Sequence, residues 1–233
     1  MQNFDTCWPD DQLKAKGLVA SIREVVNQKD AFTRMNNERE EERRQRVQQQ
    51  HTARDAKQKK LKDIETAKAA FYALFAPTDN PQARGKKLES ALNEIFRAYG
   101  ILVQEAFHLV GSDGEGIVEQ VDGVIEHKNS LYFVEMKWHR EPVGKGHISE
   151  HLVRLIGRAE ARGFVISASD YTEPAIHTAR EFLQHKLVAL IQLNELVQLL
   201  ERGDELSDFL TAKVNAAQIH KNPFFQPSAS TGQ

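Results

Sequence analysis

Cysteine is almost absent from the sequence, and so is any excess of charge of one sign. Cys7 is the only cysteine among the 233 residues, which excludes an internal disulfide and agrees with a reducing compartment. The net charge is −2 at pH 7 and the sequence pI is ≈ 6.5. A nucleic-acid partner would therefore have to be met by a local basic patch, because the chain as a whole is not basic.

Long apolar runs are missing as well. The longest run, around Leu187 to Leu193, has the length of a β-strand and not that of a membrane span. The opening residues Met-Gln-Asn-Phe-Asp have neither the basic nor the apolar region of a secretory signal. We therefore expect a soluble, cytoplasmic protein that makes no membrane contact.

Residues 1–81 are predicted to form a helical N-terminal region. Asp10 to Met35 carry apolar residues at helical spacing along one face. Asn36 to Lys60 are almost entirely polar, with acids and bases interspersed, which is typical of a solvated helix that acts as a spacer. A coiled coil is the alternative, although the seam positions of this segment are polar. The Pro77–Pro81 cluster marks the expected domain boundary.

Residues 82–221 have the pattern of a compact α/β domain, whereas residues 222–233 lack a core and are expected to be disordered. Amphipathic helices alternate with short apolar strands, and a glycine-rich loop is expected at 111–116. The expected elements are a helix at Arg84–Tyr99, a strand at Ile101–Leu109, a hairpin within 121–138, a helix at His147–Arg162, a strand at Gly163–Ser167, a helix at Glu173–His185, a strand at Leu187–Leu193 and a helix that Asn194 caps and that runs through Leu200.

The hairpin has the most informative pattern in the chain. Two apolar runs flank a polar turn at His127–Ser130, and a symmetric turn fixes the register between them. Asp122 then lies opposite Glu135, and strand alternation places Lys137 on the same face. The hairpin is thus predicted to bring two carboxylates and an ammonium group together.

This charged patch lies in a strand that is apolar on both sides, as strands covered on both faces are. Two opposed carboxylates there repel each other, and burial penalises the charge of each. A divalent cation would relieve the repulsion, since hard cations prefer carboxylate oxygens, and the lysine could orient a water on it. The alternative is that Asp122, Glu135 and Lys137 lie at strand ends and pair in solvent.

The order of elements around these residues resembles that of the PD-(D/E)XK nuclease superfamily, and within it the Mrr-like branch of type IV restriction endonucleases. The resemblance rests on Asp122, on the tripeptide Glu135-Met136-Lys137 and on the helix opening Arg84–Glu89. It implies a restriction-endonuclease-like α/β core, in which helices flank a mixed central sheet, preceded here by the long helical region. Two departures are Val121 in place of the proline, and an acid at Glu135 where many Mrr-like members have glutamine.

What this resemblance implies is a metal-dependent endonuclease that hydrolyses phosphodiester bonds of DNA, of the restriction or phage-defence type. Magnesium would be bound by Asp122, Glu135, the Met136 carbonyl and, through water, Glu89, with manganese able to substitute. Lys137 would position the attacking water. A homodimer or higher homo-oligomer is expected, with a further protein partner for the N-terminal helices as an option. The candidate DNA contacts are Arg84, Lys86, Lys87, Arg140 and Lys145.

Two other functions fit parts of the sequence. A nuclease fold can serve as a platform for a binding or assembly protein without catalysis. His147-Ile148-Ser149-Glu150-His151 also matches the H-x-x-E-H pattern of inverted zinc peptidases, in which two histidines one helical turn apart share a zinc ion. That pattern lacks an evident third ligand and gives Asp122 and Glu135 no role. Otherwise these residues would form the exposed face of the helix.

Overall fold

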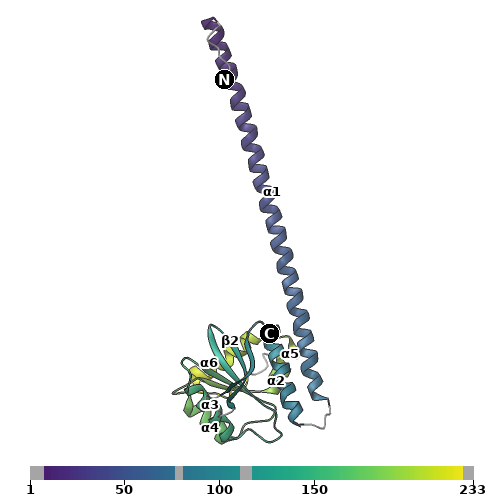
Figure 1. Ribbon diagram of the computed structural model, residues 1–233, viewed down its shortest axis with the longest axis vertical. Coiled ribbons are helices and arrows are strands. Elements are labelled where there is room, and N and C mark those ends of the chain that lie inside the picture. The colour runs from purple at the N-terminus through teal and green to yellow at the C-terminus, as the bar shows by residue number, and fades with distance from the viewer. Residues whose placement is uncertain (1–7, 77–80, 111–116, 228–233) are drawn as a thin grey trace. The chain divides into compact units, whose positions relative to one another are not determined.

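A five-stranded mixed sheet organises the computed structural model, which describes residues 8–76, 81–110 and 117–227 (Figure 1). The strand order follows the chain, and the first three strands pair antiparallel while the last three pair parallel. The predicted mixed sheet of a restriction-endonuclease-like core is thereby confirmed. The strands are β1 (Leu102–Val110), β2 (Ile117–His127), β3 (Ser130–Lys137), β4 (Arg162–Ser167) and β5 (Val188–Gln192).

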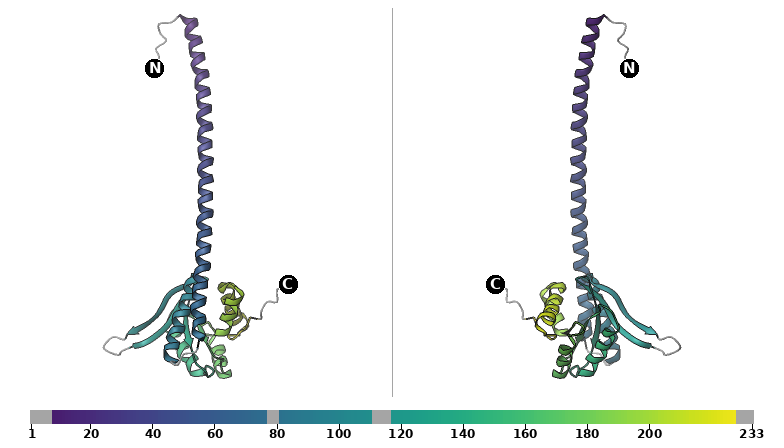
Figure 2. Two further views of the ribbon diagram at one scale, coloured as in Figure 1. Left: turned by 90° about the vertical axis from the view of Figure 1, so that its right-hand side faces the viewer. Right: turned by 90° about the vertical axis from the view of Figure 1, so that its left-hand side faces the viewer.

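The predicted hairpin is formed by β2 and β3. Its two-residue turn has Lys128 at φ 48° and Asn129 at φ 58°, the left-handed conformation that tight hairpin turns require. The register pairs Val124 with Phe133 and Gly123 with Val134, as predicted. Asp122 and Glu135 are the next positions along this register. In Figure 2 the paired ends of β1 and β2 extend away from the helices, and the predicted loop at 111–116 lies outside the described residues.

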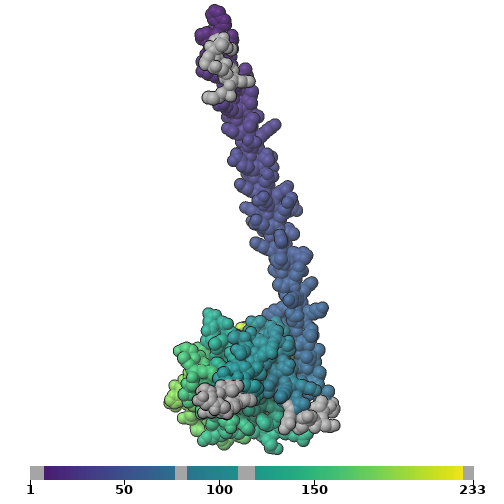
Figure 3. Space-filling view, viewed as in Figure 1, coloured from purple at the N-terminus to yellow at the C-terminus, as the bar shows by residue number. Residues whose placement is uncertain are grey.

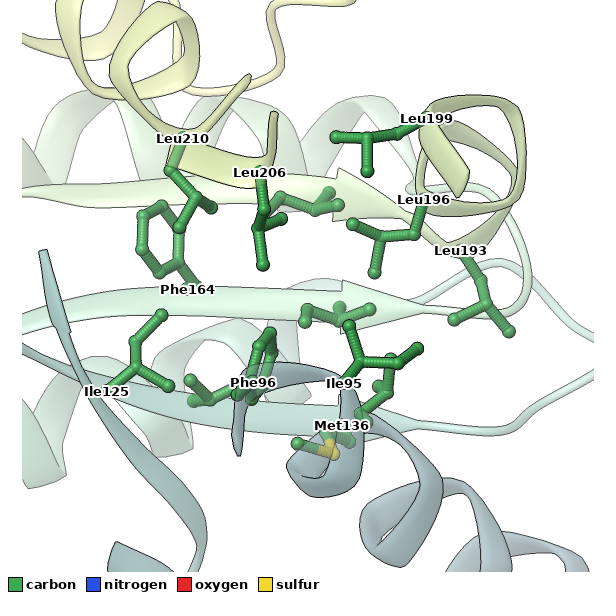
Figure 4. Close-up of a cluster of buried hydrophobic side chains, with 14 of the residues drawn as sticks. Ile95, Phe96, Ile125, Met136, Phe164, Leu193, Leu196, Leu199, Leu206 and Leu210 are labelled. Atoms are coloured by element: carbon green, nitrogen blue, oxygen red, sulfur yellow. The ribbon is translucent and has the colours of Figure 1, made fainter. Parts of the chain in front are cut away.

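Helices cover both faces of the sheet, which explains why its strands are apolar on both sides. On one face lie α2 (Pro81–Ala98), α5 (Leu193–Arg202) and α6 (Leu206–His220). Figure 4 shows Ile95 and Phe96 of α2 meeting Met136 of β3 and leucines of α5 and α6 in this core. On the other face, α3 (Lys145–Ile156) and α4 (Glu173–Phe182) pack over a second, smaller core.

The helix expected at Glu173–His185 ends at Phe182, two further helix predictions need correction, and one helix was not predicted. The helix expected at His147–Arg162 ends at Ile156, because Arg162 begins β4. The last predicted helix begins at Leu193 and is capped by Gln192, whose backbone N–H donates to Glu195, so Asn194 is not the cap. Helix α6 was not predicted, because its buried face includes a lysine, Lys213, and its apolar pattern is correspondingly weak.

The C-terminal segment belongs to the fold through residue 227, which corrects the expectation of a disordered tail from residue 222. The N–H of Leu190 in β5 donates to the Pro223 carbonyl at 2.8 Å, and Phe224 packs edge-on against Tyr171. Lys213 is fully buried and donates to Glu195 Oε2 at 2.7 Å and to the Phe225 carbonyl. Residues 228–233 lie outside the described residues.

The chain divides between Lys59 and Lys60 into two compact units. The long N-terminal helix α1 (Pro9–Tyr72) contributes residues to both of them. Its last turns pack into the core of the second unit through Ala67 and Phe71, and Leu74 of the short helix η1 (Ala73–Phe75) joins them. The compact units therefore divide earlier than the expected 81/82 boundary, and residues 77–80 lie outside the description.

The first unit is helical, as predicted, but its apolar face is exposed. Leu18 is 66% exposed, Ile22 62% and Phe32 62%. Figure 1 draws this purple to blue segment as a helix, and Figure 3 shows its side chains on the surface. The polar segment that follows has the expected acid–base pairs at helical spacing, such as Arg44 with Glu40 at 3.7 Å. None of the helices within the described residues is both long and apolar enough to cross a membrane.

Candidate active site

Asp122 in the middle of β2 comes together with Glu135 and Lys137 near the end of β3, as their register predicts. Both carboxylates are buried, each residue being only 5% exposed, so the alternative of strand-end charges paired in solvent is excluded. Lys137 Nζ lies 2.6 Å from Glu135 Oε1. Asp122 Oδ2 accepts the Met136 N–H at 2.8 Å, and this bond holds the aspartate across the two strands.

Helix α3 adds two groups to the site that sequence reasoning did not place there. Arg154 Nη1 lies 2.6 Å from Glu135 Oε2, and His151 Nδ1 lies 3.6 Å from the same oxygen. His151 is buried, and its Nε2 has no hydrogen-bond partner among the described residues. The available signal was the three-residue spacing of His151 and Arg154 beside the buried apolar face of α3.

The two carboxylates of the hairpin have opposite electrostatic surroundings. Burial opposes ionisation of Glu135, but its contact with His151 and the charge of Lys137 outweigh burial and lower its pKa to about 2. Burial also raises the pKa of Asp122, the negative charge of Glu135 raises it further, and the Met136 N–H offsets only part of this. The surroundings therefore favour the anion of Glu135, whereas they disfavour the ionised form of Asp122.

Glu89 lies on α2, close enough to interact with both acids. Burial raises its pKa first, and the charges of Asp122 and Glu135 raise it further. It lines a cavity of about 380 Å³ together with Lys86, Asn93 and Gln120. Asn93 donates to the Asp122 carbonyl at 3.0 Å, which ties α2 to the hairpin.

The candidate DNA contacts lie on the segments around the site. Lys86 and Lys87 are exposed on α2, Lys145 is exposed at the start of α3, and Arg140 is exposed between β3 and α3. Arg84 is half-buried with its guanidinium 5.6 Å from the centre of the Trp138 ring. Their contact with nucleic acid stays a prediction.

The zinc motif is not assembled. His147 is exposed and stacks on His139, with 5.2 Å between ring centres, whereas His151 is buried against Glu135. The expectation that the whole motif forms an exposed helix face is therefore wrong for His151. Within the part of the chain that the structure describes, no three His, Cys, Asp or Glu side chains converge as a metal-binding group. A zinc site of the peptidase type has no third ligand there.

Magnesium makes a weaker demand on the protein, because it keeps several waters and commonly uses one or two carboxylates plus substrate oxygens. Asp122 and Glu135 meet that demand. They are buried on adjacent strands. The charge of Glu135 makes ionisation of Asp122 less favourable, and the charges of both acids make ionisation of Glu89 less favourable. A cation bound here would relieve this repulsion. The donor set therefore fits a magnesium ion held by these two acids.

Comparison with known proteins gives one family. No curated protein matches the chain. Protein VC1899 from Vibrio cholerae matches with a TM-score of 0.42 and 21% identity over 59% of this chain and 37% of VC1899, so this chain spans well under half of that protein. NucC of E. coli MS115-1, in its cAAA-bound form, matches with a TM-score of 0.37 and 11% identity over 57% of this chain and 74% of NucC.

The restriction endonuclease MspJI, solved with a 27-mer oligonucleotide, matches with a TM-score of 0.34 and 16% identity over 68% of this chain and 35% of MspJI. These structural likenesses are weak. The sequence match is more extensive, because the restriction endonuclease model Mrr_cat covers residues 81–200 and so includes the hairpin, α2, α3 and the strands that follow. Since that match takes in more than half of the residues, the chain belongs to the Mrr family of restriction endonucleases.

Proposed function

We propose that the chain is a magnesium-dependent endonuclease that hydrolyses phosphodiester bonds of DNA. One observation carries the proposal, namely the pair of buried carboxylates of Asp122 and Glu135 on adjacent strands with Lys137 beside them. Membership of the restriction endonuclease family supports this assignment. The family also suggests a role in restriction or phage defence.

The residues divide the chemical work as follows. Asp122, Glu135 and the Met136 carbonyl would hold magnesium or manganese, with Glu89 acting through water. When bound, the metal supplies Lewis-acid polarisation of the phosphate and acidification of a water. Lys137 is partly exposed beside Glu135 and can orient that water and offset the charge that develops on the phosphate. Burial of the acids excludes bulk water and strengthens these interactions.

Substrate binding would rest on the basic residues around the site. Arg84, Lys86, Lys87, Arg140 and Lys145 are proposed to contact phosphates, and such contacts give affinity without reading sequence. Cleavage of both strands by a site that cuts one would require two copies of the chain, so we propose a homodimer.

The proposal is tested by incubating supercoiled plasmid with the wild-type protein and with Glu135→Ala, in magnesium, in manganese and in EDTA. We expect the wild type to nick or linearise the plasmid only with a metal, and Glu135→Ala to be slower by on the order of 10²-fold or more, as for the loss of other catalytic groups. Glu126→Ala is the matched control, because Glu126 lies on the same hairpin but is exposed.

A labelled RNA of the same sequence, run in parallel, decides which nucleic acid is cut. Plasmid left intact by the wild type in both metals would contradict the proposal. Binding without cleavage, seen as a gel shift, would instead favour a non-catalytic binding protein. Equal rates for the wild type and Glu135→Ala would remove Glu135 from the mechanism.

A further inference from the structure

We propose that Arg154 is a phosphate-contacting residue of this site. When a divalent cation binds, Arg154 exchanges its contact with Glu135 for a contact with a phosphate of the nucleic acid. The inference rests on the proposed nuclease function and adds a residue that the family motif does not include. Arg154 Nη1 lies 2.6 Å from Oε2 of Glu135, one of the two acids proposed to hold the metal.

The position of Arg154 is fixed by the packing of α3. Ile148, Leu152 and Leu155 are buried against the sheet and set the rotation of the helix. His151 and Arg154 are three residues apart, so they lie on neighbouring positions of one helix face and both reach Glu135. The backbone thus places a guanidinium group at the site before any ligand arrives.

Arg158, two residues beyond the end of α3, has the contacts of a structural arginine. Its Nη1 and Nη2 bind the two Glu119 oxygens at 2.7 and 2.8 Å, and its guanidinium stacks 4.6 Å from the centre of the Phe133 ring. Arg154 instead contacts Glu135 through Nη1, and its side chain is 28% exposed. Arg154 can therefore change partner without losing a bidentate pair or a stacking surface.

The charges of the site make that change favourable. Glu135 carries one negative charge but faces both Lys137 and Arg154, at 2.6 Å each. A divalent cation held by Asp122 and Glu135 would add two positive charges beside them and so weaken the Arg154 pair. A phosphate brought to the same site offers the guanidinium a replacement anion, and the planar fork of arginine matches phosphate oxygens.

The first test measures metal binding without nucleic acid. Manganese is titrated calorimetrically into the wild type, Arg154→Gln and Arg202→Gln. Arg202 is the matched control, since it is the last residue of α5, on the other face of the sheet, and pairs with Asp204. Removal of the Arg154 charge should make manganese bind roughly five- to tenfold more tightly to Arg154→Gln than to the wild type. The manganese affinity of Arg202→Gln should equal that of the wild type. Equal or weaker binding by Arg154→Gln overturns the inference.

The second test detects the phosphate contact itself. Binding of a short duplex is measured against salt concentration in the Lys137→Ala background, which suppresses cleavage, with and without Arg154→Gln. With manganese, Arg154→Gln should lower the slope of log K against log salt by about one, the amount expected for one lost phosphate contact. In EDTA the slope should not change, because Arg154 is then paired with Glu135.

Arg154→Lys keeps the charge and should retain the slope, which also provides a second variant if Arg154→Gln fails to fold. An unchanged slope in manganese for Arg154→Gln, or a loss of slope in EDTA, overturns the inference. If the wild type cuts no nucleic acid, the proposed function fails separately, and the manganese titration still decides whether Arg154 competes with the metal.

Discussion

At the scale of single residues, Asp122 and Glu135 occupy equivalent places on facing strands yet differ in what stabilises them. Glu135 is surrounded by Lys137, Arg154 and His151, which favour its anion. Asp122 accepts a neutral backbone N–H and pairs with no cation among the described residues. The two acids should therefore contribute to folding stability with opposite signs.

We expect Glu135→Gln to destabilise the metal-free protein and Asp122→Asn to stabilise it, both measured by urea unfolding in EDTA at pH 7. The pKa of Glu135 is lowered to about 2 on folding, so its contribution, roughly 2–3 kcal/mol, is present above its usual pKa and is lost as the pH falls toward 2. The pKa of Asp122 is raised on folding, so its ionised form costs stability at neutral pH and not in acid.

The stabilising effect of Asp122→Asn should therefore fade as the pH is lowered through the pKa that Asp122 has in the folded protein. Stabilisation that persists unchanged below the usual pKa of aspartate would show a cause other than charge. A loss of stability in both variants at pH 7 would contradict the opposite assignment of the two acids.

The site could be predicted from the sequence only as far as strand alternation reaches. Asp122, Glu135 and Lys137 are linked by a two-residue turn and a period of two, both of which are local properties. His151 and Arg154 reach Glu135 only because α3 crosses the sheet after a glycine and proline break. Their placement depends on tertiary packing, which one sequence does not specify.

At the scale of elements, the approach of α3 to β4 depends on Gly163. A Cβ atom at this position would lie 2.6 Å from Leu155 Cδ1 and 2.7 Å from His151 Nε2. The missing side chain lets the His151 ring lie directly over the strand, next to Glu135. The glycine thus serves the site without touching a substrate.

We expect Gly163→Ala to destabilise the fold by about 1–3 kcal/mol, as overpacking of a core does, and to lower plasmid cleavage because His151 is displaced from Glu135. Thermal unfolding and the plasmid assay measure the two effects. Gly157→Ala is the matched control, since a Cβ there would meet only the Arg154 carbonyl oxygen at 3.8 Å. If both variants behave alike, the close contact at Gly163 has no consequence for the site.

The elements were predictable where a strong local signal marks them. Strands β2 to β5 follow apolar runs bounded by turn residues, and α2 follows an amphipathic pattern that ends before Gly100. Helix α6 was missed because Lys213 occupies a core position, where its charge is met by Glu195 and by backbone carbonyls. In the sequence, the charged residues of such a buried ion pair have the pattern of an exposed helix face.

At the scale of the whole molecule, the first compact unit leaves a row of apolar side chains exposed. Leu18, Ile22, Val25 and Phe32 recur at spacings of three, four and seven residues, the pattern of a two-stranded coiled coil. Packing of an apolar face gives most protein helices their stability, and this segment has no such packing against the described residues of its own unit. A second copy of the chain is the occupant that its regular spacing favours.

We expect Ile22→Glu combined with Val25→Glu to reduce a dimer to a monomer, because four charges would then lie in one helical seam. Light scattering after size exclusion measures the mass at several protein concentrations. Val47→Glu is the control, because Val47 is 59% exposed in the polar part of the same helix. A wild-type monomer at all concentrations would show that this face does not join two copies.

The segment at residues 223–226 limits how the edge of the sheet can pair with another copy of the chain. Strand β5 is the last in the sheet, and an open row of backbone groups on such a strand is a template for strand addition and aggregation. Here the Leu190 N–H is already taken by Pro223, and buried Lys213 fastens the segment through the Phe225 carbonyl. A lysine inside the core thus protects the sheet edge from intermolecular β-pairing.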